Sequence, residues 1–418
     1  MMTRSALFLG IDIGTSGVRA VAVDPDLKVS AIARAEFGTD DVIRRDPSVW
    51  HQALGECLAE LCQKVDPTDF TALSVDGTSG TILALDGKHE PIGSALMYND
   101  AVGDQRILGE ITANAPRESA AHGASSALAR AIMLQECSGV ARIVHQADWI
   151  AERLAGHPVP SDESNALKSG YDPVARQWPE WIKATSLQMD LLPEVVPTGT
   201  VIAKTSGAFG LPSGISIVAG MTDGCASFLA TGANRPGDGV TALGTTMTLK
   251  LLSDGPLFAP EYGIYSHRIG DLWLAGGASN SGGGALLDHF TPDEIRGLSG
   301  QIDPESPCEL DYYPLRAPGE RFPIDDPTLP SRETPRPIDD AEFLKGLLTG
   351  IARIEALGYQ RLSELGAPSL ASIRSVGGGA NNPVWARIRH NLLGVPAEPV
   401  LAGEAAFGSA LVARGAMI

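Results

Sequence analysis

An aspartate, Asp12, stands just before a glycine-threonine-serine turn at residues 14–16, between two apolar runs at 7–13 and 18–23. Runs rich in branched residues predict β-strands, so the turn should join the strands of a hairpin. Its backbone N–H groups and hydroxyls could bind phosphate, and the glycine lets the backbone approach phosphate oxygens closely. A carboxylate at this point could hold hydrated Mg²⁺, a hard cation that prefers oxygen ligands. The alternative is an ordinary hairpin with an acidic residue near its turn.

A second acidic residue, Asp223, could act as a general base. It follows the apolar run at 215–218 and precedes a short helical pattern that includes Phe228. A carboxylate at a helix N-terminus stays ionised and can accept the proton of an alcohol. Two alternatives remain open here. One is a plain helix cap, and the other is Cys225 as a nucleophile, although no histidine partner for it lies nearby in the sequence.

Two segments with glycine could bind a sugar and a nucleobase. The turn at 76–80 contains Ser79, and small hydroxyl side chains at a strand end can bind sugar hydroxyls, although Asp-Gly turns are common. Three glycines at 377–379 follow an expected strand, and Asn382 and Pro383 then begin a helix. Bare backbone there could receive a flat ring such as adenine. The alternative is a glycine-rich connection between the strand and the helix.

The elements that must position these residues alternate between strands and amphipathic helices. Apolar runs predict further strands at 70–75 and 81–85, and residues 46–64 have the spacing of an amphipathic helix. This alternation is typical of an α/β chain. The turn at 14–16 has a weak counterpart at 244–246, where Gly-Thr-Thr also stands between two apolar runs. We therefore expect a duplicated pair of domains with one ligand between them.

Length and composition narrow the possibilities. The chain has 418 residues, and single cores stop growing near roughly 250 to 300 residues, so we expect two domains. We place them at 1–230 and 231–418, with the last helix packing back on the first domain. The segment at 311–340 contains seven prolines, but its aromatic residues predict that it packs against the protein.

The charge and the cysteines exclude several classes of function. A net charge of −18 disfavours binding to nucleic acids and anionic membranes, which need clustered positive charge, and leaves small molecules as the expected partners. No uncharged apolar stretch reaches the ~20 residues of a membrane span, and Asp12 interrupts the first apolar run, so we expect a cytoplasmic protein. The five cysteines show neither a disulfide framework nor the spacing of zinc ligands.

Several short segments together resemble the FGGY family of carbohydrate kinases, within the actin-like, Hsp70-like ATPase fold. Their order and spacing cover nearly the whole chain. The segments that resemble the first phosphate motif, the catalytic loop, the second phosphate motif and the adenosine motif are Asp12–Ser16, Met221–Asp223, Gly244–Thr246 and Gly377–Ala380. Within the family the chain most resembles the compact D-ribulose kinases of cyanobacteria and plant plastids, through residues 74–81, 146–149, 165–168, 311–314 and 319–323.

The resemblance implies a fold and a reaction. The fold would be two ribonuclease H-like domains with a cleft for nucleotide and sugar between them. The reaction would transfer the ATP γ-phosphoryl group to the terminal hydroxyl of D-ribulose, with Asp223 as the base and Asp12 as the holder of Mg²⁺. The sugar would contact Asp12, Ser79 and Asp223. The residues that would bind ATP are Thr15, Ser16, Gly244, Thr245, Thr246, Gly378, Gly379, Asn382 and Trp385.

One stretch departs from the family. Larger members carry a Trp-x-Asp-x-Arg stretch that reads the sugar, whereas residues 96–100 here are Leu-Met-Tyr-Asn-Asp. A D-xylulose or other polyol kinase is therefore an alternative to a D-ribulose kinase. A nucleotide-gated assembly or binding protein on the same fold is a second alternative, which Ser79 and Asp223 disfavour. We expect a monomer or homodimer whose partners are ATP and a sugar, with no nucleic acid and no membrane.

Overall fold

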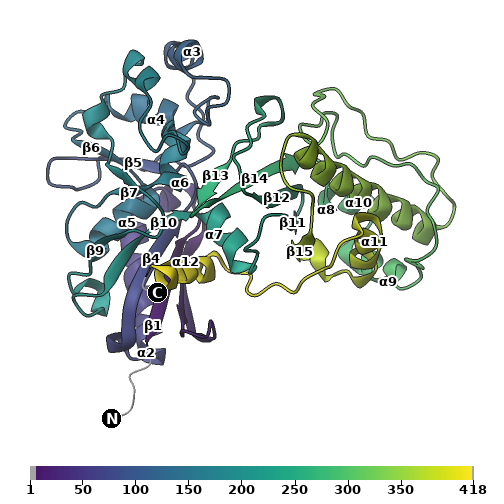
Figure 1. Ribbon diagram of the computed structural model, residues 1–418, viewed down its shortest axis with the longest axis horizontal. Helices are drawn as coiled ribbons and strands as arrows, with labels where there is room; N and C mark the ends of the chain where they lie inside the picture. The colour runs from purple at the N-terminus through teal and green to yellow at the C-terminus, as the bar shows by residue number, and fades with distance from the viewer. Residues whose placement is uncertain (1–5, 417–418) are drawn as a thin grey trace. The chain divides into compact units, whose positions relative to one another are not determined.

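The computed structural model describes residues 6–416, which fold into two units (Figure 1). The first unit comprises Met1–Ala230, His267–Gly270 and Ala402–Ile418, and the second comprises Thr231–Ser266 and Asp271–Leu401. The limits expected from the sequence put residues 267–270, and those from 402 onward, in the second domain. Residues 267–270 belong instead to the first unit, which the sequence did not predict, whereas the return of the last helix to the first unit agrees with the expectation that it packs back there.

The first unit is built around a mixed β-sheet. Its strands are β1 (Leu7–Ile13), β2 (Gly17–Val23), β3 (Val29–Glu36), β4 (Phe70–Gly77), β9 (Val201–Lys204) and β10 (Ser216–Thr222), in the order β3-β2-β1-β4-β10-β9. β1 pairs antiparallel with β2 and parallel with β4, and β10 also runs parallel to β4. The carboxyl ends of β1, β4 and β10 therefore lie at the same edge of the sheet, where ligands bind in open α/β sheets.

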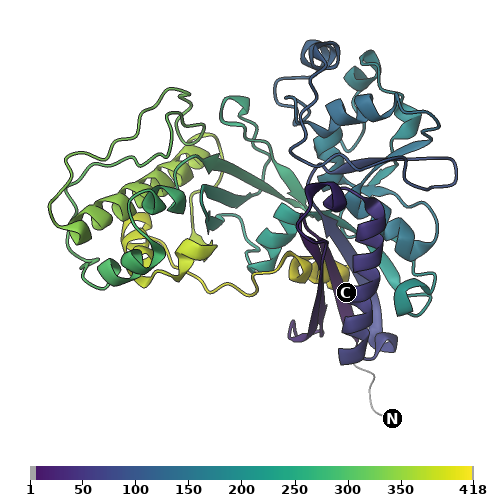
Figure 2. The ribbon, with the colours of Figure 1, turned by 180° about the vertical axis from the view of Figure 1, so that it is seen from behind.

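One face of this sheet is covered by α2 (Pro47–Lys64) and α5 (Gln146–Ala155). Both helices share an apolar core with Leu9, Ile11 and Ile13 of β1. Alternate residues of a strand point to opposite faces, so the odd-numbered residues of β1 face these helices. Figure 2 shows α2 in front of the sheet when the molecule is seen from behind.

The opposite face is covered by α12 (Ala405–Gly415), drawn in yellow in Figure 1. This face carries the even-numbered residues of β1, which include Gly10 and Asp12. A side chain at Gly10 would place its Cβ 1.7 Å from the carbonyl oxygen of Ala406, so only glycine allows α12 to lie this close. β1 is apolar along almost its whole length because helices cover both of its faces.

The start of α2 confirms the helix expected at 46–64. The carboxylate of Asp46 accepts a hydrogen bond from the backbone N of Ser48 at 2.8 Å, and Pro47 is the first helical residue. An N-terminal cap followed by proline satisfies one exposed N–H and removes another.

Smaller elements complete the first unit. A separate apolar cluster lies under a two-stranded sheet, β5 (Ile82–Leu85) with β6 (Arg142–His145), and is also lined by α3 (Gln105–Asn114) and α4 (Ala127–Leu134). The other short elements are α1 (Asp41–Arg44), α6 (Glu163–Ala166), α7 (Asp223–Ala230), β7 (Ser161–Asp162), β8 (Val195–Val196) and β13 (His267–Ile269).

The second unit repeats the topology of the first. Its strands β11 (Asp238–Leu243), β12 (Met247–Ser253), β14 (Leu272–Ser279) and β15 (Ser372–Val376) lie in the order β14-β12-β11-β15. As in β3-β2-β1-β4, three antiparallel strands are followed by one parallel strand. The internal repeat expected from the two Gly-Thr turns is therefore confirmed at the level of topology. The helices are α8 (Gly283–Leu287), α9 (Pro292–Ser299), α10 (Asp340–Glu364) and α11 (Pro383–Leu393).

The proline-rich segment at 311–340 packs against the second unit, as its aromatic residues predict. Tyr312, Tyr313 and Phe322 are buried in the same core as the apolar face of α10. All five cysteines are free thiols; Cys57 and Cys225 are buried, whereas Cys137 is exposed. Within residues 6–416, no helix combines the length and the apolar character that crossing a membrane requires.

Candidate functional site

A cavity of about 350 Å³ opens at the carboxyl edge of the sheet in the first unit. Asp12 and Asp223 both line it, at the ends of the parallel strands β1 and β10. The exposed Thr15 and Ser16 of the β1–β2 turn also line it. The structure thus brings both expected acidic residues and the first phosphate turn to one cavity, although they are far apart in the sequence.

Asp12 is a nearly buried carboxylate, with 5% of its surface exposed. In the parallel pairing of β1 with β4 it stands opposite Asp76. Desolvation raises the pKa of Asp12 to about 6; the hydrogen bond with Asp76 lowers it, and the charge of Asp223 raises it further. A buried carboxylate with a raised pKa gains from a nearby cation, because the cation offsets the lost hydration.

Asp76 is fully buried beside Asp12. Burial, and then the charge of Asp12, raise the pKa of Asp76 well above its ordinary value. Its Oδ2 accepts a hydrogen bond from Ser409 Oγ of α12 at 2.5 Å. Two adjoining carboxyl groups cannot both ionise cheaply, because each charge raises the pKa of the other group.

Two arginines lie at the same cavity. Arg19 and Arg34 are cross-strand partners in β2 and β3, and both line the cavity. Glu404 bridges them, at 3.3 Å from Arg19 and 2.7 Å from Arg34, and Arg19 Nη1 lies 3.8 Å from Asp12 Oδ2. Like charges placed opposite each other on a sheet repel, so this pair needs the anion that Glu404 supplies. The cavity therefore contains positive charge suited to phosphate as well as carboxylates suited to a metal ion.

Asp223 is the first residue of α7 and is half-buried. Its Oδ1 accepts hydrogen bonds from the backbone N of Gly224 at 2.7 Å and of Ser79 at 3.4 Å. These bonds fix the carboxylate in one orientation, which a general base requires. The competing residue Cys225 is 2% exposed, so it is shielded from any substrate. Ser79 lies beside Asp223, and its own Oγ is buried with no hydrogen-bond partner within the described residues.

Several residues of this site could not be assigned a role from the sequence. Asp76 lies in the turn predicted at 76–80, and pairing the predicted strands 7–13 and 70–75 in parallel would have put it beside Asp12. Arg19 is five residues beyond the phosphate turn's glycine, and its place opposite Asp12 follows from the hairpin register. Nothing in the sequence pointed to Ser409 or Glu404, which approach only through the packing of α12.

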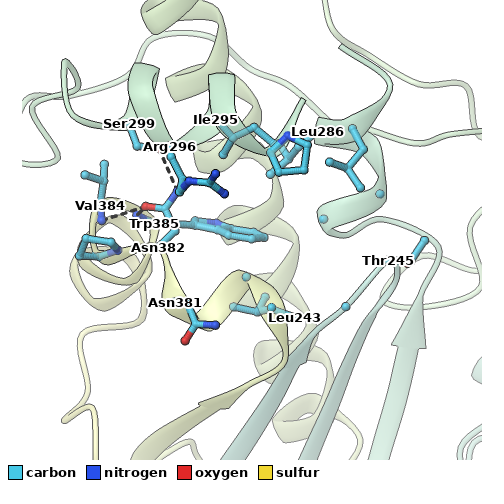
Figure 3. A pocket seen from close by; sticks show the side chains of 18 of the residues that line it. Leu243, Thr245, Leu286, Ile295, Arg296, Ser299, Asn381, Asn382, Val384 and Trp385 are labelled. Carbon is cyan, nitrogen blue, oxygen red and sulfur yellow. Dashed lines mark hydrogen bonds between the residues drawn. The ribbon is translucent and has the colours of Figure 1, made fainter. Parts of the chain in front are cut away.

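A second cavity, of about 830 Å³, lies within the second unit (Figure 3). It brings together six of the residues expected to bind ATP, which are Gly244, Thr245, Gly378, Gly379, Asn382 and Trp385. Thr246 is exposed and does not line it. Apolar side chains, including Leu286 and Ile295, line the same space. A mostly apolar cavity with a few polar groups is the usual site for a flat ring such as a nucleobase.

The base of this cavity is built by α11. Trp385 is 1% exposed, and its Nε1 donates to the carbonyl oxygen of Leu348 at 3.1 Å. Asn382 caps the helix by accepting from the backbone N of Val384 and of Trp385, and its Nδ2 donates to Ser299 Oγ at 2.9 Å. Figure 3 shows these side chains around the opening. Asn382 therefore shapes the cavity chiefly by starting the helix.

We expect Gly379→Ala to weaken ATP binding. A Cβ at Gly379 would lie 2.5 Å from Trp385 Cζ3 and 2.9 Å from Leu243 Cβ, so the added methyl group must push the indole out of place. A tenfold or larger rise in the KM for ATP is expected, at nearly constant KM for the sugar, because overpacking a rigid wall costs about 1 to 3 kcal/mol. Steady-state kinetics in both substrates would measure it.

The control for this variant is Gly297→Ala. Gly297 is on α9, where an added Cβ would meet nothing within 4 Å. Alanine is a better helix former than glycine, so kinetics should be unchanged. An ATP KM in Gly379→Ala that stays within about twofold of the parent would contradict the assigned role of this wall.

The residues of the first cavity suit a divalent cation. Within residues 6–416, no group of three or more His, Cys, Asp and Glu side chains forms a metal site by itself. Asp12 and Asp76 nevertheless form a buried carboxyl pair in which the pKa of each group is raised, and Asp223 adds negative charge nearby. Mg²⁺ commonly takes only one or two protein carboxylates, with water and phosphate oxygens as its other ligands. The donor set therefore fits Mg²⁺ that arrives with a nucleotide.

Two models of one protein family match this chain. The N-terminal domain of the FGGY family of carbohydrate kinases matches residues 7–112, and its C-terminal domain matches residues 239–417. The chain belongs to the FGGY family of carbohydrate kinases. It is thus an ATP-dependent sugar kinase, and the sugar kinases of this family typically use Mg²⁺ with ATP.

Individual relatives agree with this placement. The xylulose kinase of Streptomyces coelicolor is 30% identical over 267 residues, which are 59% of this chain and 54%, or about half, of that protein. The L-fuculokinase of Salmonella typhi is 25% identical over 459 residues, covering 96% of this chain and 92% of that protein. A kinase from Brucella ovis has a similar solved structure, with a TM-score of 0.84 at 20% identity over 98% of this chain and 90% of that one. The fold is therefore the two-domain α/β fold of these kinases, ribonuclease H-like in each domain.

Proposed function

We propose that this FGGY kinase phosphorylates the terminal hydroxyl of D-ribulose, with ATP as donor, to give D-ribulose 5-phosphate and ADP. The observation that carries the reaction type is the cavity of the first unit, where Asp12 and Asp223 lie together with the hydroxyls of the phosphate turn. A base, a holder for Mg²⁺ and a phosphate-binding turn are the groups that phosphoryl transfer to an alcohol needs.

Asp223 acts as the general base. The sugar hydroxyl oxygen attacks the γ-phosphorus, its proton passes to the Asp223 carboxylate, and the bond from the γ-phosphorus to the bridging oxygen breaks to release ADP. The transition state is loose, so the proton leaves late and correct placement of the two reactants supplies much of the rate. The bonds from Ser79 and Gly224 to Asp223 Oδ1 hold the base in place for this step.

Asp12 is the residue that would hold Mg²⁺. The neighbouring carboxyl group of Asp76 would orient the Asp12 carboxylate. When bound, Mg²⁺ neutralises charge on the phosphate oxygens. Thr15 and Ser16 bind phosphate from the turn, and Arg19 adds positive charge at the same cavity. The second unit binds the adenosine of ATP in the cavity that Trp385 lines. Gly244 and Thr245, which line the same cavity, bind the phosphates of ATP.

The choice of D-ribulose rests on the sugar-side segments. The stretch at 96–100 lacks the tryptophan and arginine that larger family members use, and its backbone is fixed instead by Asp100, whose Oδ2 accepts from Met97 N and pairs with Arg45. The segments at 74–81 and 165–168 resemble those of D-ribulose kinases. The relatives named as xylulose kinases favour D-xylulose as the second candidate. Because ATP is abundant in the cytoplasm, we propose that the enzyme acts there.

The experiment that tests the proposal is a panel of sugars in an ADP-release assay. We expect D-ribulose to have the highest kcat/KM among D-ribulose, D-xylulose, L-ribulose, L-fuculose and glycerol, by about tenfold or more, since a site built for one pattern of hydroxyls leaves polar groups unpaired with another. The matched control is the same panel with Asp223→Asn. A clear preference for D-xylulose would replace D-ribulose as the substrate, and ADP release that no added sugar stimulates would contradict kinase activity on this panel.

A further inference from the structure

A buried arginine lies beneath the loop that carries Ser79. Arg130 of α4 is 1% exposed, and in the described part of the chain its guanidinium donates only to backbone carbonyl oxygens. Nη2 donates to Gly80 O at 2.6 Å, and Nη1 donates to Tyr98 O and to Asp100 O at 3.0 Å each. One side chain therefore joins the β4–β5 loop to the stretch at 96–100.

The burial of Arg130 has a cost in charge. Burial lowers the pKa of Arg130 to about 10, only partly opposed by the charge of Asp100. The carboxylate of Asp100 is already engaged by Arg45 and by the backbone N of Met97, and Arg130 forms no ion pair within residues 6–416. Its Nε is buried and has no hydrogen-bond partner among residues 6–416. Burying a charged group with incomplete pairing is costly, and an apolar side chain in this cluster would avoid the cost.

The same loop is held from its other side by Gln146 of α5. The Gln146 side chain accepts a hydrogen bond from Thr78 N at 3.0 Å, and its backbone N donates to Thr81 O at 3.0 Å. Between these two points, Gly80 has a φ of +81°, a conformation that favours glycine. Thr78, Gly80 and Thr81 are thus fixed around Ser79, whose N–H donates to Asp223 Oδ1 at 3.4 Å.

We propose that Arg130 is a positioning residue for the acceptor sugar, because through the carbonyl of Gly80 it holds Ser79 against Asp223. This inference rests on the proposed function, in which Ser79 contacts the sugar and Asp223 takes its proton. Ser79 Oγ, buried and unpartnered in the described chain, is then presented at a fixed place beside the base. The same guanidinium also donates to the carbonyl oxygens of Tyr98 and Asp100 and so fixes the stretch at 96–100. In larger family members the corresponding stretch reads the sugar.

The test is kinetic and uses Arg130→Lys and Arg130→Met in the full chain. Lysine keeps the charge but has no planar fork to reach three carbonyls, and methionine keeps only the volume. We expect kcat/KM for the sugar to fall about 10- to 100-fold in both, because a displacement near 1 Å of a reacting group costs about that much. The KM for ATP should stay within about twofold, because the adenosine cavity lies in the second unit.

Arg389→Lys is the matched control. Arg389 is also buried, at 3% exposed, but it pairs with Glu355 in the second unit. Its replacement should lower thermal stability without changing the KM for the sugar. A merely structural role for Arg130 would give the same result as this control, so the contrast between the two sugar KM values decides the matter.

Gly80→Ala attacks the same contact from the loop. A Cβ at this positive φ is strained and would lie 3.2 Å from Arg130 Nη2, so we expect the same loss in kcat/KM for the sugar even if the Arg130 variants fold poorly. Sugar kinetics unchanged in Arg130→Lys and Gly80→Ala would overturn the inference and leave the proposed function intact. Failure of the unmutated enzyme on the sugar panel would instead overturn the proposed function.

Discussion

Asp223→Asn is expected to bind ATP normally and to lose about 10²- to 10⁴-fold in kcat, the usual contribution of a general base. Asparagine has the shape of aspartate, and its Oδ1 can still accept from the backbone N of Ser79 and of Gly224. The substitution therefore removes the acceptor for the hydroxyl proton while keeping the local structure. Steady-state ADP release gives kcat, and titration with ATP alone gives the dissociation constant.

The control is another aspartate at the start of a helix. Asp46 caps α2 by accepting from Ser48 N, and it lies outside both cavities. Asparagine caps helices as well as aspartate does, so Asp46→Asn should keep its turnover. If Asp223→Asn kept its kcat within about tenfold of the parent, Asp223 would be a helix cap and no more.

Asp12→Asn is expected to remove activity and yet to stabilise the metal-free protein at alkaline pH. The loss of activity follows because Asp12 is the proposed holder of Mg²⁺. Changes in groups that only support a metal ligand cost about 10- to 100-fold in metal affinity, so loss of the holder itself should raise the Mg²⁺ requirement by at least about 100-fold. ADP release as a function of Mg²⁺ concentration measures this part.

The gain in stability follows from the pKa of Asp12, which burial raises to about 6. Because the folded state binds this proton more tightly than the unfolded state, the free energy of unfolding falls as the pH rises from about 4 toward and through 6. At pH 8 the ionised Asp12 therefore destabilises the metal-free protein, and asparagine removes that cost. Thermal melts without metal should show a higher Tm for Asp12→Asn at pH 8 and no gain near pH 4.

Asp238→Asn is expected to change the Tm at pH 8 in the opposite direction. Asp238 is desolvated, but hydrogen bonds from Asn234 N, Ser372 Oγ and Arg235 N outweigh this and lower its pKa. Its ionised form thus contributes stability above about pH 4, which is lost as the pH falls, so this variant should have a lower Tm at pH 8. Equal or lower stability of Asp12→Asn at pH 8 would mean that Asp12 is not strained in the metal-free protein.

Much of the local structure could be predicted because its causes are local. The strand at 7–13, the helix after Asp46 and the cap at Asn382 depend on side chains within a few residues of one another. The two Gly-Thr turns also revealed the internal repeat, since each needs only its own hairpin. The limits of the domains were less predictable, because residues 267–270 lie within the second domain in the sequence and yet belong to the first unit.

The missed parts of the site have causes that are distant in the sequence. Asp76 gained its role from the parallel register of β4 with β1, which sets it beside Asp12. Glu404 meets Arg19 and Arg34 only after α12 has packed on the sheet. Arg130 was not predicted, because its donors meet the carbonyl oxygens of Gly80, Tyr98 and Asp100 only when distant parts of the chain pack together.

The sequence by itself determined the α/β elements, the phosphate turns and the acidic residues able to do chemistry, because residue type and spacing fix these over a few positions. Only the tertiary structure decided which of those residues share a cavity, which carboxyl groups are buried together and what holds them. The hydrogen bond from Ser409 to Asp76 spans 333 positions. Burial and pKa depend on neighbours in space, and packing across the whole chain chooses those neighbours.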